Sequence, residues 1–225
     1  MEKLRDKDGL TEEEFLARYD ASRFERPSVT VDVAAFKWQG GDLYLLLIKR
    51  GGHPFLGKRA LPGGFVEPDE TVETAAAREL EEETSVKGAA LLPIGVFSEP
   101  LRDPRTRIIT VAFLSLLEDK DLIIEAGDDA ASADWVRVCI TERRTEKTDG
   151  KEVKSFKVRL VLSELGKGEE DVFFKAEFCR ELSAVTAGTV RSAEPLNVLA
   201  GDHAKIVATA ADKLMDLLEK TNKNK

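Results

Sequence analysis

Three glutamates are spaced so that they would share one face of a helix. Glu79, Glu82 and Glu83 stand at positions i, i+3 and i+4 of a segment that follows a glycine pair, Gly63-Gly64. Like charges at these helical spacings weaken a helix by about 0.2–0.5 kcal/mol per pair. A hard divalent cation would compensate this repulsion, because Mg²⁺ prefers carboxylate oxygens and takes substrate phosphates as further ligands. The spacing therefore indicates a metal-dependent enzyme that acts on a phosphorylated substrate.

The glutamates belong to a longer pattern of fixed spacing. Gly64 is followed after five residues by Glu70, and after seven more by the run RELEEETSV, which begins at Arg78. This pattern resembles the Nudix box, the loop–helix–loop of the Nudix hydrolases, at every fixed position except one. Ser85 stands where that family has glycine, which takes a left-handed conformation without strain. We expect the serine to cost stability on the order of 1 kcal/mol and to leave the chemistry intact.

The resemblance implies a metal site in the box. Glu79, Glu82 and Glu83, together with the carbonyl of Gly63, would hold Mg²⁺ or Mn²⁺ as the cofactor. A bound ion lowers the pKa of a water, which a carboxylate then deprotonates for attack on a pyrophosphate. Glu82 is the first candidate for that base, and three glutamates on later segments are alternatives: Glu99, Glu118 and Glu125.

The resemblance also implies residues that organise the site. Arg78 would hold one carboxylate through a two-pronged ion pair, and it joins Glu82 as a candidate catalytic residue. Glu70 would pin the loop to the helix, and Gly64 would have a structural role in the loop.

Four other stretches are similar to the ADP-ribose pyrophosphatase branch of the family, which shares them with bacterial Nudix-related regulators. They are residues 58–71, 102–113, 133–138 and 199–210. The resemblance implies cleavage of ADP-ribose, or of a related nucleoside diphosphate linked to a group X, into AMP (or another NMP) and a phosphorylated X. Guanidinium groups suit phosphate oxygens, so the substrate's diphosphate would be bound by arginines that follow a predicted strand: Arg102, Arg105 and Arg107. Equally, these arginines could be loop residues tied to Glu99 or Asp103.

Two other functions remain open. The chain could be a Nudix enzyme for another nucleotide, such as an NTP, NADH or a dinucleotide. It could also be a non-catalytic sensor that binds an ADP-ribose-type nucleotide and regulates transcription. The complete set of carboxylates speaks against a sensor, and the last third lacks the pattern of two short helices and a glycine turn that a DNA reader would have.

The elements that must position these residues alternate between strands and helices. Apolar runs at 28–38 and 43–49 flank Gly40-Gly41 and predict a hairpin. The glycine- and proline-rich loop that follows would form a lid beside the substrate. The acidic helix is expected at 71–84, and further strands are expected at 90–97, 108–117 and 133–139. This order predicts an α/β protein with a mixed sheet, an α/β/α sandwich of the Nudix type.

Both ends of the chain carry additions to this pattern. Thr11 and Glu14 have capping-box spacing, so residues 1–24 are expected to be a helical extension. Residues 25–225 would form the Nudix domain, with an inserted hairpin region at about 141–195. Its strands, 153–162 and 172–179, place aromatic residues on one face, which suits a homodimer interface. A final helix is expected from about Asp202.

Composition limits the remaining possibilities. The formal net charge of −8 speaks against general nucleic-acid binding. We expect no membrane span, because no apolar run reaches the length of about 20 residues that a bilayer requires. Cys139 and Cys179 are too few for a disulfide framework, so a cytoplasmic location is expected. The basic excess in residues 143–159 would bind an acidic partner or, as we favour, form the solvated face of the hairpin.

Overall fold

A single mixed sheet forms the centre of the structure. The computed structural model describes residues 4–117, 124, 130–148, 151–164, 168–181, 189–194 and 198–223. Within these residues, nine strands lie in the order β4-β5-β1-β2-β6-β7-β8-β9, with β3 paired to β2. The strands are β1 (Ser28–Gln39), β2 (Asp42–Arg50), β3 (Arg59–Ala60), β4 (Leu92–Phe97), β5 (Ile108–Leu117), β6 (Ala130–Thr148), β7 (Lys151–Glu164), β8 (Gly168–Glu181) and β9 (Thr189–Glu194). The helices are α1 (Glu12–Arg18), η1 (Ala21–Arg23), α2 (Val72–Thr84) and α3 (His203–Lys223).

β1 is the central strand on which the site is built. It pairs in parallel with β5 along its first ten residues and antiparallel with β2. Gly40 and Gly41 connect β1 to β2 with φ values of 62° and 89°, a region that glycine adopts at no steric cost. The hairpin predicted from the sequence is therefore confirmed.

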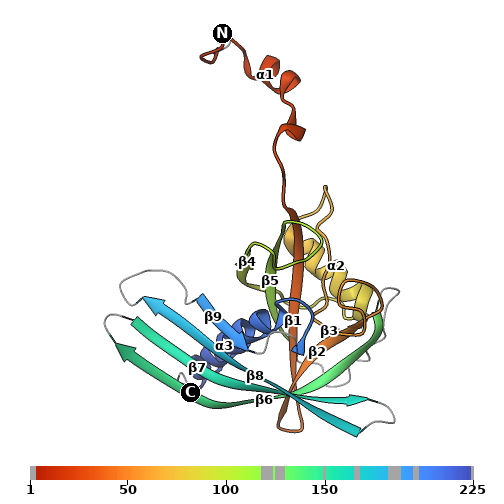
Figure 1. Ribbon diagram of the computed structural model, residues 1–225, viewed down its shortest axis with the longest axis vertical. Helices are drawn as coiled ribbons and strands as arrows, with labels where there is room; N and C mark the ends of the chain where they lie inside the picture. The colour runs from red at the N-terminus through yellow and green to blue at the C-terminus, as the bar shows by residue number, and fades with distance from the viewer. Residues whose placement is uncertain are drawn as a thin grey trace.

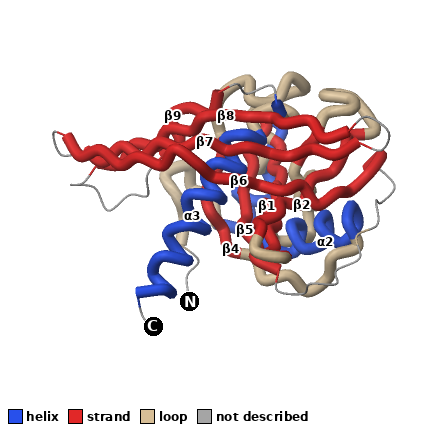
Figure 2. Tube along the Cα trace, turned by 90° about the horizontal axis from the view of Figure 1, so that it is seen from below, coloured by secondary structure: helices blue, strands red, loops and turns tan. Residues whose placement is uncertain are grey.

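The sheet is covered by one helix on each face (Figures 1 and 2). Val31 and Val33 of β1 are in the same buried cluster as Leu80 of α2. Ala34 and Phe36 point the other way, into the cluster that contains α3. Because successive side chains of β1 point to two faces that are both buried, its sequence is an almost continuous apolar run. The predicted α/β sandwich with a mixed sheet is confirmed.

The two ends of α2 are fixed by local interactions. Thr71 caps the first turn, with its hydroxyl accepting a hydrogen bond from Thr74 N–H at 3.2 Å. At the other end Ser85 adopts the left-handed conformation, with φ 62° and ψ 11°, and its N–H donates to the Glu81 carbonyl. The serine therefore takes the conformation that glycine would supply more easily.

Replacing Ser85 with glycine should raise the free energy of unfolding by up to about 1 kcal/mol, because the left-handed conformation strains any residue that has a Cβ atom. Urea denaturation monitored by circular dichroism would measure the change. The cavity described below should be unaffected, since Ser85 is exposed and does not line it. A glycine variant that is less stable than the wild type would contradict this account of the helix end.

The C-terminal third extends the sheet. β6 is longer than the strand expected at 133–139, and β7 and β8 form the predicted second hairpin. The sequence pattern did not indicate β9, which pairs with β8. The aromatic face of the hairpin was expected to be free for a dimer contact, and this was wrong. Phe156, Phe174 and Phe178 are buried in the cluster that contains α3.

Basic side chains of residues 143–159 form ion pairs within the chain. Arg143 pairs with Glu219 at 2.9 Å, and Lys154 lies between Asp212 and Asp216 of α3 at 3.2 and 2.9 Å. These contacts favour a structural role for the basic residues over the binding of an acidic partner.

The N-terminal segment projects from the body of the molecule (Figure 1). α1 has the predicted capping box, in which Thr11 and Glu14 exchange hydrogen bonds, and none of its residues is buried. That residues 1–24 and 141–195 are additions to a central domain stays a prediction. None of the described helices is both long and apolar enough to cross a membrane.

Candidate functional site

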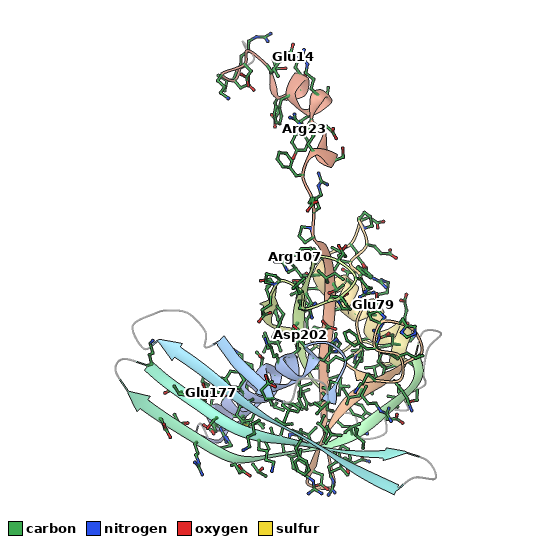
Figure 3. The ribbon with its side chains drawn as sticks, in the orientation of Figure 1. Glu14, Arg23, Glu79, Arg107, Glu177 and Asp202 are labelled. Carbon is green, nitrogen blue, oxygen red and sulfur yellow. The ribbon has the colours of Figure 1, made fainter. Side chains whose placement is uncertain are left out.

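A cavity of about 480 Å³ lies where β1, α2 and the start of α3 meet. Its walls come from β1 near Asp32, residues 50–55, the glycine loop 63–65, α2, residues in 102–105, and residues 200–203. Figure 3 labels two lining residues, Glu79 on α2 and Asp202 just before α3. The predicted lid loop therefore does border the cavity, together with the acidic helix.

The glycine loop runs beside β1 and makes close contact with it. Val31 N–H donates to the Gly64 carbonyl and Val33 N–H to the Pro62 carbonyl, both at 2.9 Å. A Cβ atom on Gly63 would lie 2.1 Å from the Val31 carbonyl oxygen. A Cβ atom on Gly64 would lie 2.3 Å from a carboxylate oxygen of Glu79. The two glycines therefore have different tasks: one lets the loop approach the strand, and the other leaves room for the Glu79 carboxylate.

Arg78 connects the loop to the acidic helix. Its guanidinium binds Glu70 at 2.6 and 3.2 Å, Glu79 at 2.9 Å and Glu82 at 3.0 Å. It also donates to the Phe65 carbonyl at 3.0 Å. Glu70 accepts from Glu67 N–H at 2.9 Å, so the pair Arg78–Glu70 holds loop and helix together. These contacts agree with the organising roles expected for Arg78 and Glu70.

Two glutamates of α2 are desolvated at the cavity wall. Burial raises the pKa of Glu83 to about 7, although Gly63 N–H donates to its carboxylate at 2.9 Å. Burial also raises the pKa of Glu79, although Arg78 binds it. Desolvation makes the charged form of both carboxylates costly, and Arg78 binds Glu79 and not Glu83. A divalent cation would supply compensating positive charge, so the chemistry of these side chains fits a hard metal ion.

The carboxylates of Glu79, Glu82 and Glu83 are not arranged around a single point. Among the residues that the structure describes, no group of three or more acidic, histidine or cysteine side chains is placed to hold one ion. Glu79 and Glu82 are bound to Arg78, and Glu83 is bound to the loop. Coordination of an ion by all three would therefore require their side chains to rotate.

The other candidates for the general base are spread out. Glu82 is largely exposed, binds Arg78 and is absent from the cavity wall. Glu99 is half exposed and pairs with Lys205 at 3.4 Å. Glu118 and Glu125 lie outside the described residues. Glu83, like Glu79, is a part-buried carboxylate of α2 that borders the cavity directly.

The three candidate phosphate-binding arginines have different surroundings. Arg102 borders the cavity but is held by Asp202 through two hydrogen bonds of 2.9 and 2.7 Å. Arg105 also borders it, pairs with Asp103 at 2.8 Å and lies over the ring of Phe65. Arg107 lies outside the cavity wall and donates to the Glu99 carbonyl at 3.4 Å. The structure brings two of the three arginines to the cavity.

Sequence reasoning missed several polar side chains on the part of the cavity wall that β1 and the start of α3 form. Asp32, Asp202 and His203 line it together with Arg102, and Arg50 lies at the entry of the lid loop. Asp32 had a visible signal, because it is the one charged residue in the apolar run SVTVDVAAF. His203 is the first residue of α3, and no sequence pattern marked it as part of a site.

Comparison with protein families and with curated proteins gives consistent results. A family model described as the NUDIX domain matches residues 26–154. The ADP-ribose pyrophosphatase of Methanocaldococcus jannaschii is 45% identical over 109 residues, which is 48% of this chain. The ADPR responsive transcriptional repressor NtrR of Acinetobacter baylyi is 38% identical over 112 residues, 49% of this chain. The chain spans 61% and 45% of the lengths of these two relatives.

Solved structures extend the similarity. A MutT/nudix family protein from Enterococcus faecalis has a TM-score of 0.65 and 30% identity, with 92% of this chain and 70% of that chain covered. The NUDIX domain of Shewanella oneidensis NrtR, solved with ADP ribose, has a TM-score of 0.53 and 32% identity. That match covers 56% of this chain and 82% of the other.

Proposed function

The chain belongs to the NUDIX domain family, and from this premise we propose that it is a divalent-metal-dependent pyrophosphohydrolase. Its substrate is ADP-ribose or a related nucleoside diphosphate-X, and its products are AMP (or another NMP) and a phosphorylated X. The observation that carries this proposal is the pair of part-buried carboxylates, Glu79 and Glu83, at the wall of a cavity that also contains arginines. The 45% identity to an ADP-ribose pyrophosphatase supports the choice of substrate.

In this proposal the acidic helix holds the metal. Glu79, Glu82 and Glu83 bind Mg²⁺ or Mn²⁺, with the Gly63 carbonyl as a further ligand. The ion supplies a water of lowered pKa and neutralises phosphate charge. Glu82 remains the first candidate for the base, and Arg78 keeps the carboxylates in place while it also binds the loop at Glu70 and Phe65.

Substrate binding in this proposal uses the cationic and aromatic groups of the cavity. Arg105 at the rim is half exposed and is available for a phosphate oxygen if it turns from Asp103. Phe65, which is also half exposed, offers a ring beside Arg105. Arg107 would contribute only through charge, from outside the cavity wall. Guanidinium groups pair with phosphate oxygens through two parallel hydrogen bonds.

A substrate panel tests the proposal. The purified protein is incubated with Mg²⁺ and ADP-ribose, NADH, diadenosine polyphosphates or NTPs, and a phosphatase-coupled assay measures the phosphate released. We expect ADP-ribose to be cleaved fastest and its products to be AMP and ribose 5-phosphate. Preferential cleavage of NTPs or dinucleotides would assign the enzyme to another substrate. No cleavage of any compound with Mg²⁺ or Mn²⁺ would overturn the hydrolase proposal.

A second candidate is a nucleotide sensor. The observation in its favour is the 38% identity to an ADPR responsive transcriptional repressor. Against it, the described residues of the last third are β7, β8, β9 and α3, with no pair of short helices among them. Binding of ADP-ribose without hydrolysis, together with a gel shift of genomic fragments at low salt, would favour the sensor.

Two further properties belong to the proposal. We expect the protein to work in the reducing cytoplasm, where Cys139 and Cys179 would remain thiols. We also expect a homodimer, which size-exclusion chromatography with light scattering would test.

A further inference from the structure

The part of the cavity wall that β1 and the start of α3 form carries a charged side chain that the proposed chemistry does not use. Asp32 is in the middle of β1 and only 7% exposed, and it lines the cavity. One of its oxygens, Oδ2, accepts a hydrogen bond from Thr110 Oγ1 at 2.7 Å and lies 3.9 Å from Arg102. The other oxygen, Oδ1, lies 3.6 Å from His203 Nε2. That separation is too long for a hydrogen bond.

The contacts of His203 determine which of its nitrogens carries the proton. Leu61 N–H donates to His203 Nδ1 at 2.9 Å, so Nδ1 is an acceptor and has no hydrogen. In the neutral imidazole the hydrogen is then on Nε2. The Nε2–H group of His203 is thus a donor beside the acceptor Asp32 Oδ1. The two groups are not hydrogen-bonded to each other.

Neighbouring groups hold both side chains in place. Arg102 and Asp202 form a buried two-pronged ion pair, and Asp202 directly precedes His203. Thr110 fixes the Asp32 carboxylate from β5. The donor and the acceptor are therefore preorganised, which is the condition for selective binding of a polar group.

We propose that Asp32 and His203 form a subsite for one sugar hydroxyl of the substrate. A hydroxyl group can donate to Asp32 Oδ1 and accept from His203 Nε2 at the same time, because it has one hydrogen and two lone pairs. This assignment rests on the proposed function, and it adds a residue pair that determines specificity for the sugar.

The charge around the subsite selects the hydroxyl over a phosphate. Asp32 and Asp202 carry two negative charges and Arg102 one positive charge, so these three side chains have a net charge of −1. A phosphate would be repelled by Asp32 and has no hydrogen to donate to it once ionised. The diphosphate of the substrate therefore lies toward the metal-binding side of the cavity, and a sugar lies on Asp32.

Equilibrium binding of analogues that cannot be hydrolysed tests the subsite without turnover. The probes are α,β-methylene ADP-ribose and α,β-methylene ADP, which lacks the terminal ribose. Isothermal titration calorimetry with Mg²⁺ would measure Kd for the wild type, Asp32→Asn and His203→Asn. The asparagine at 203 can still accept from Leu61 N–H but has no group at the position of Nε2. Asp212→Asn is the matched control, since it changes a part-buried carboxylate on α3 outside the cavity.

We expect Asp32→Asn to weaken binding of the methylene ADP-ribose by about 10- to 100-fold, as for a lost hydrogen bond to a charged group. His203→Asn should weaken it by about 2- to 10-fold, as for a neutral hydrogen bond. Asp212→Asn should leave Kd unchanged. Thermal unfolding would check that each variant is folded. If Asp32→Asn does not fold, His203→Asn still tests the subsite.

Each outcome has a defined meaning. Weaker binding of methylene ADP-ribose alone supports the subsite and assigns it to the terminal ribose. Weaker binding of both analogues supports it and assigns it to the adenosine ribose. Unchanged Kd values for folded Asp32→Asn and His203→Asn would overturn the subsite and leave the proposed function standing. A wild type that binds neither analogue would instead overturn the proposed function.

Discussion

Replacing Glu83 with glutamine should lower kcat for ADP-ribose by more than about 100-fold, since even groups that only orient a metal ligand are typically worth 10- to 100-fold. Glutamine has nearly the same shape, and its amide oxygen can still accept the hydrogen bond from Gly63 N–H. It lacks the negative charge that a divalent ion would bind. The change therefore removes the proposed metal ligand while the loop keeps its contact with the helix.

Glu81→Gln is the matched control for this experiment. Glu81 is on the same helix, is exposed and pairs with Lys87 at 2.9 Å, away from the cavity. We expect its kcat to equal that of the wild type. Initial rates at saturating ADP-ribose and Mg²⁺ would compare the two variants. Full activity of Glu83→Gln would remove Glu83 from the metal site.

The Glu83→Gln variant should also be more stable than the wild type at alkaline pH when divalent ions are absent. Burial raises the pKa of Glu83 from 4.5 to about 7, so the folded chain holds a proton that the unfolded chain releases. The stability that this group contributes is complete below pH 4.5 and is lost as the pH rises to about 7. Glutamine does not titrate. Thermal unfolding in EDTA should show a gap in Tm at pH 8 that shrinks toward pH 4.5.

Gly63→Ala should lower stability and Gly64→Ala should lower activity. Gly63→Ala should be the most destabilising change proposed for this chain. Its Cβ atom would lie 2.1 Å from the Val31 carbonyl oxygen and 2.9 Å from the Asp32 Cα, and φ at this position is 156°. Neither backbone atom can move without disturbing the central strand. We expect a loss of about 3 kcal/mol, within the range for overpacked cores, and a decrease in Tm of about 6–12 °C for a chain of this size.

Gly64→Ala should leave the fold intact and reduce activity. Its Cβ atom would meet the end of the Glu79 side chain, which can rotate away. Moving that carboxylate misplaces a proposed metal ligand, and we expect a decrease in kcat of about 10- to 100-fold. Differential scanning calorimetry and initial rates would measure the two effects. A Gly63→Ala variant with wild-type Tm would contradict the close approach of the loop to β1.

Local patterns predicted the acidic helix and the first hairpin well. Both rest on neighbours in the sequence: the cap at Thr71, the apolar stripe that includes Leu80, and the glycine turn at Gly40-Gly41. The left-handed conformation of Ser85 came from the resemblance instead, because the family has glycine at this position.

The polar side chains on the cavity wall between β1 and α3 are positioned by contacts between residues far apart in the sequence, which a sequence pattern does not show. Arg102 was expected to face a phosphate, and its partner Asp202 is 100 residues away. The aromatic face around Phe156 was interpreted as exposed because the pattern of a strand shows which residues share a face but not what covers it. Here α3 covers it.

The family match ends at residue 154, whereas the cavity is completed by residues 200–203 in front of α3. A fragment cut at that boundary would keep the whole acidic helix and lose the wall that contains Asp202 and His203. Under the two proposals, the metal ligands of α2 and the His203 half of the sugar subsite therefore come from separate stretches of the chain. Exchanging the last quarter of the chain between relatives should alter which compound is accepted before it alters how the bond is broken.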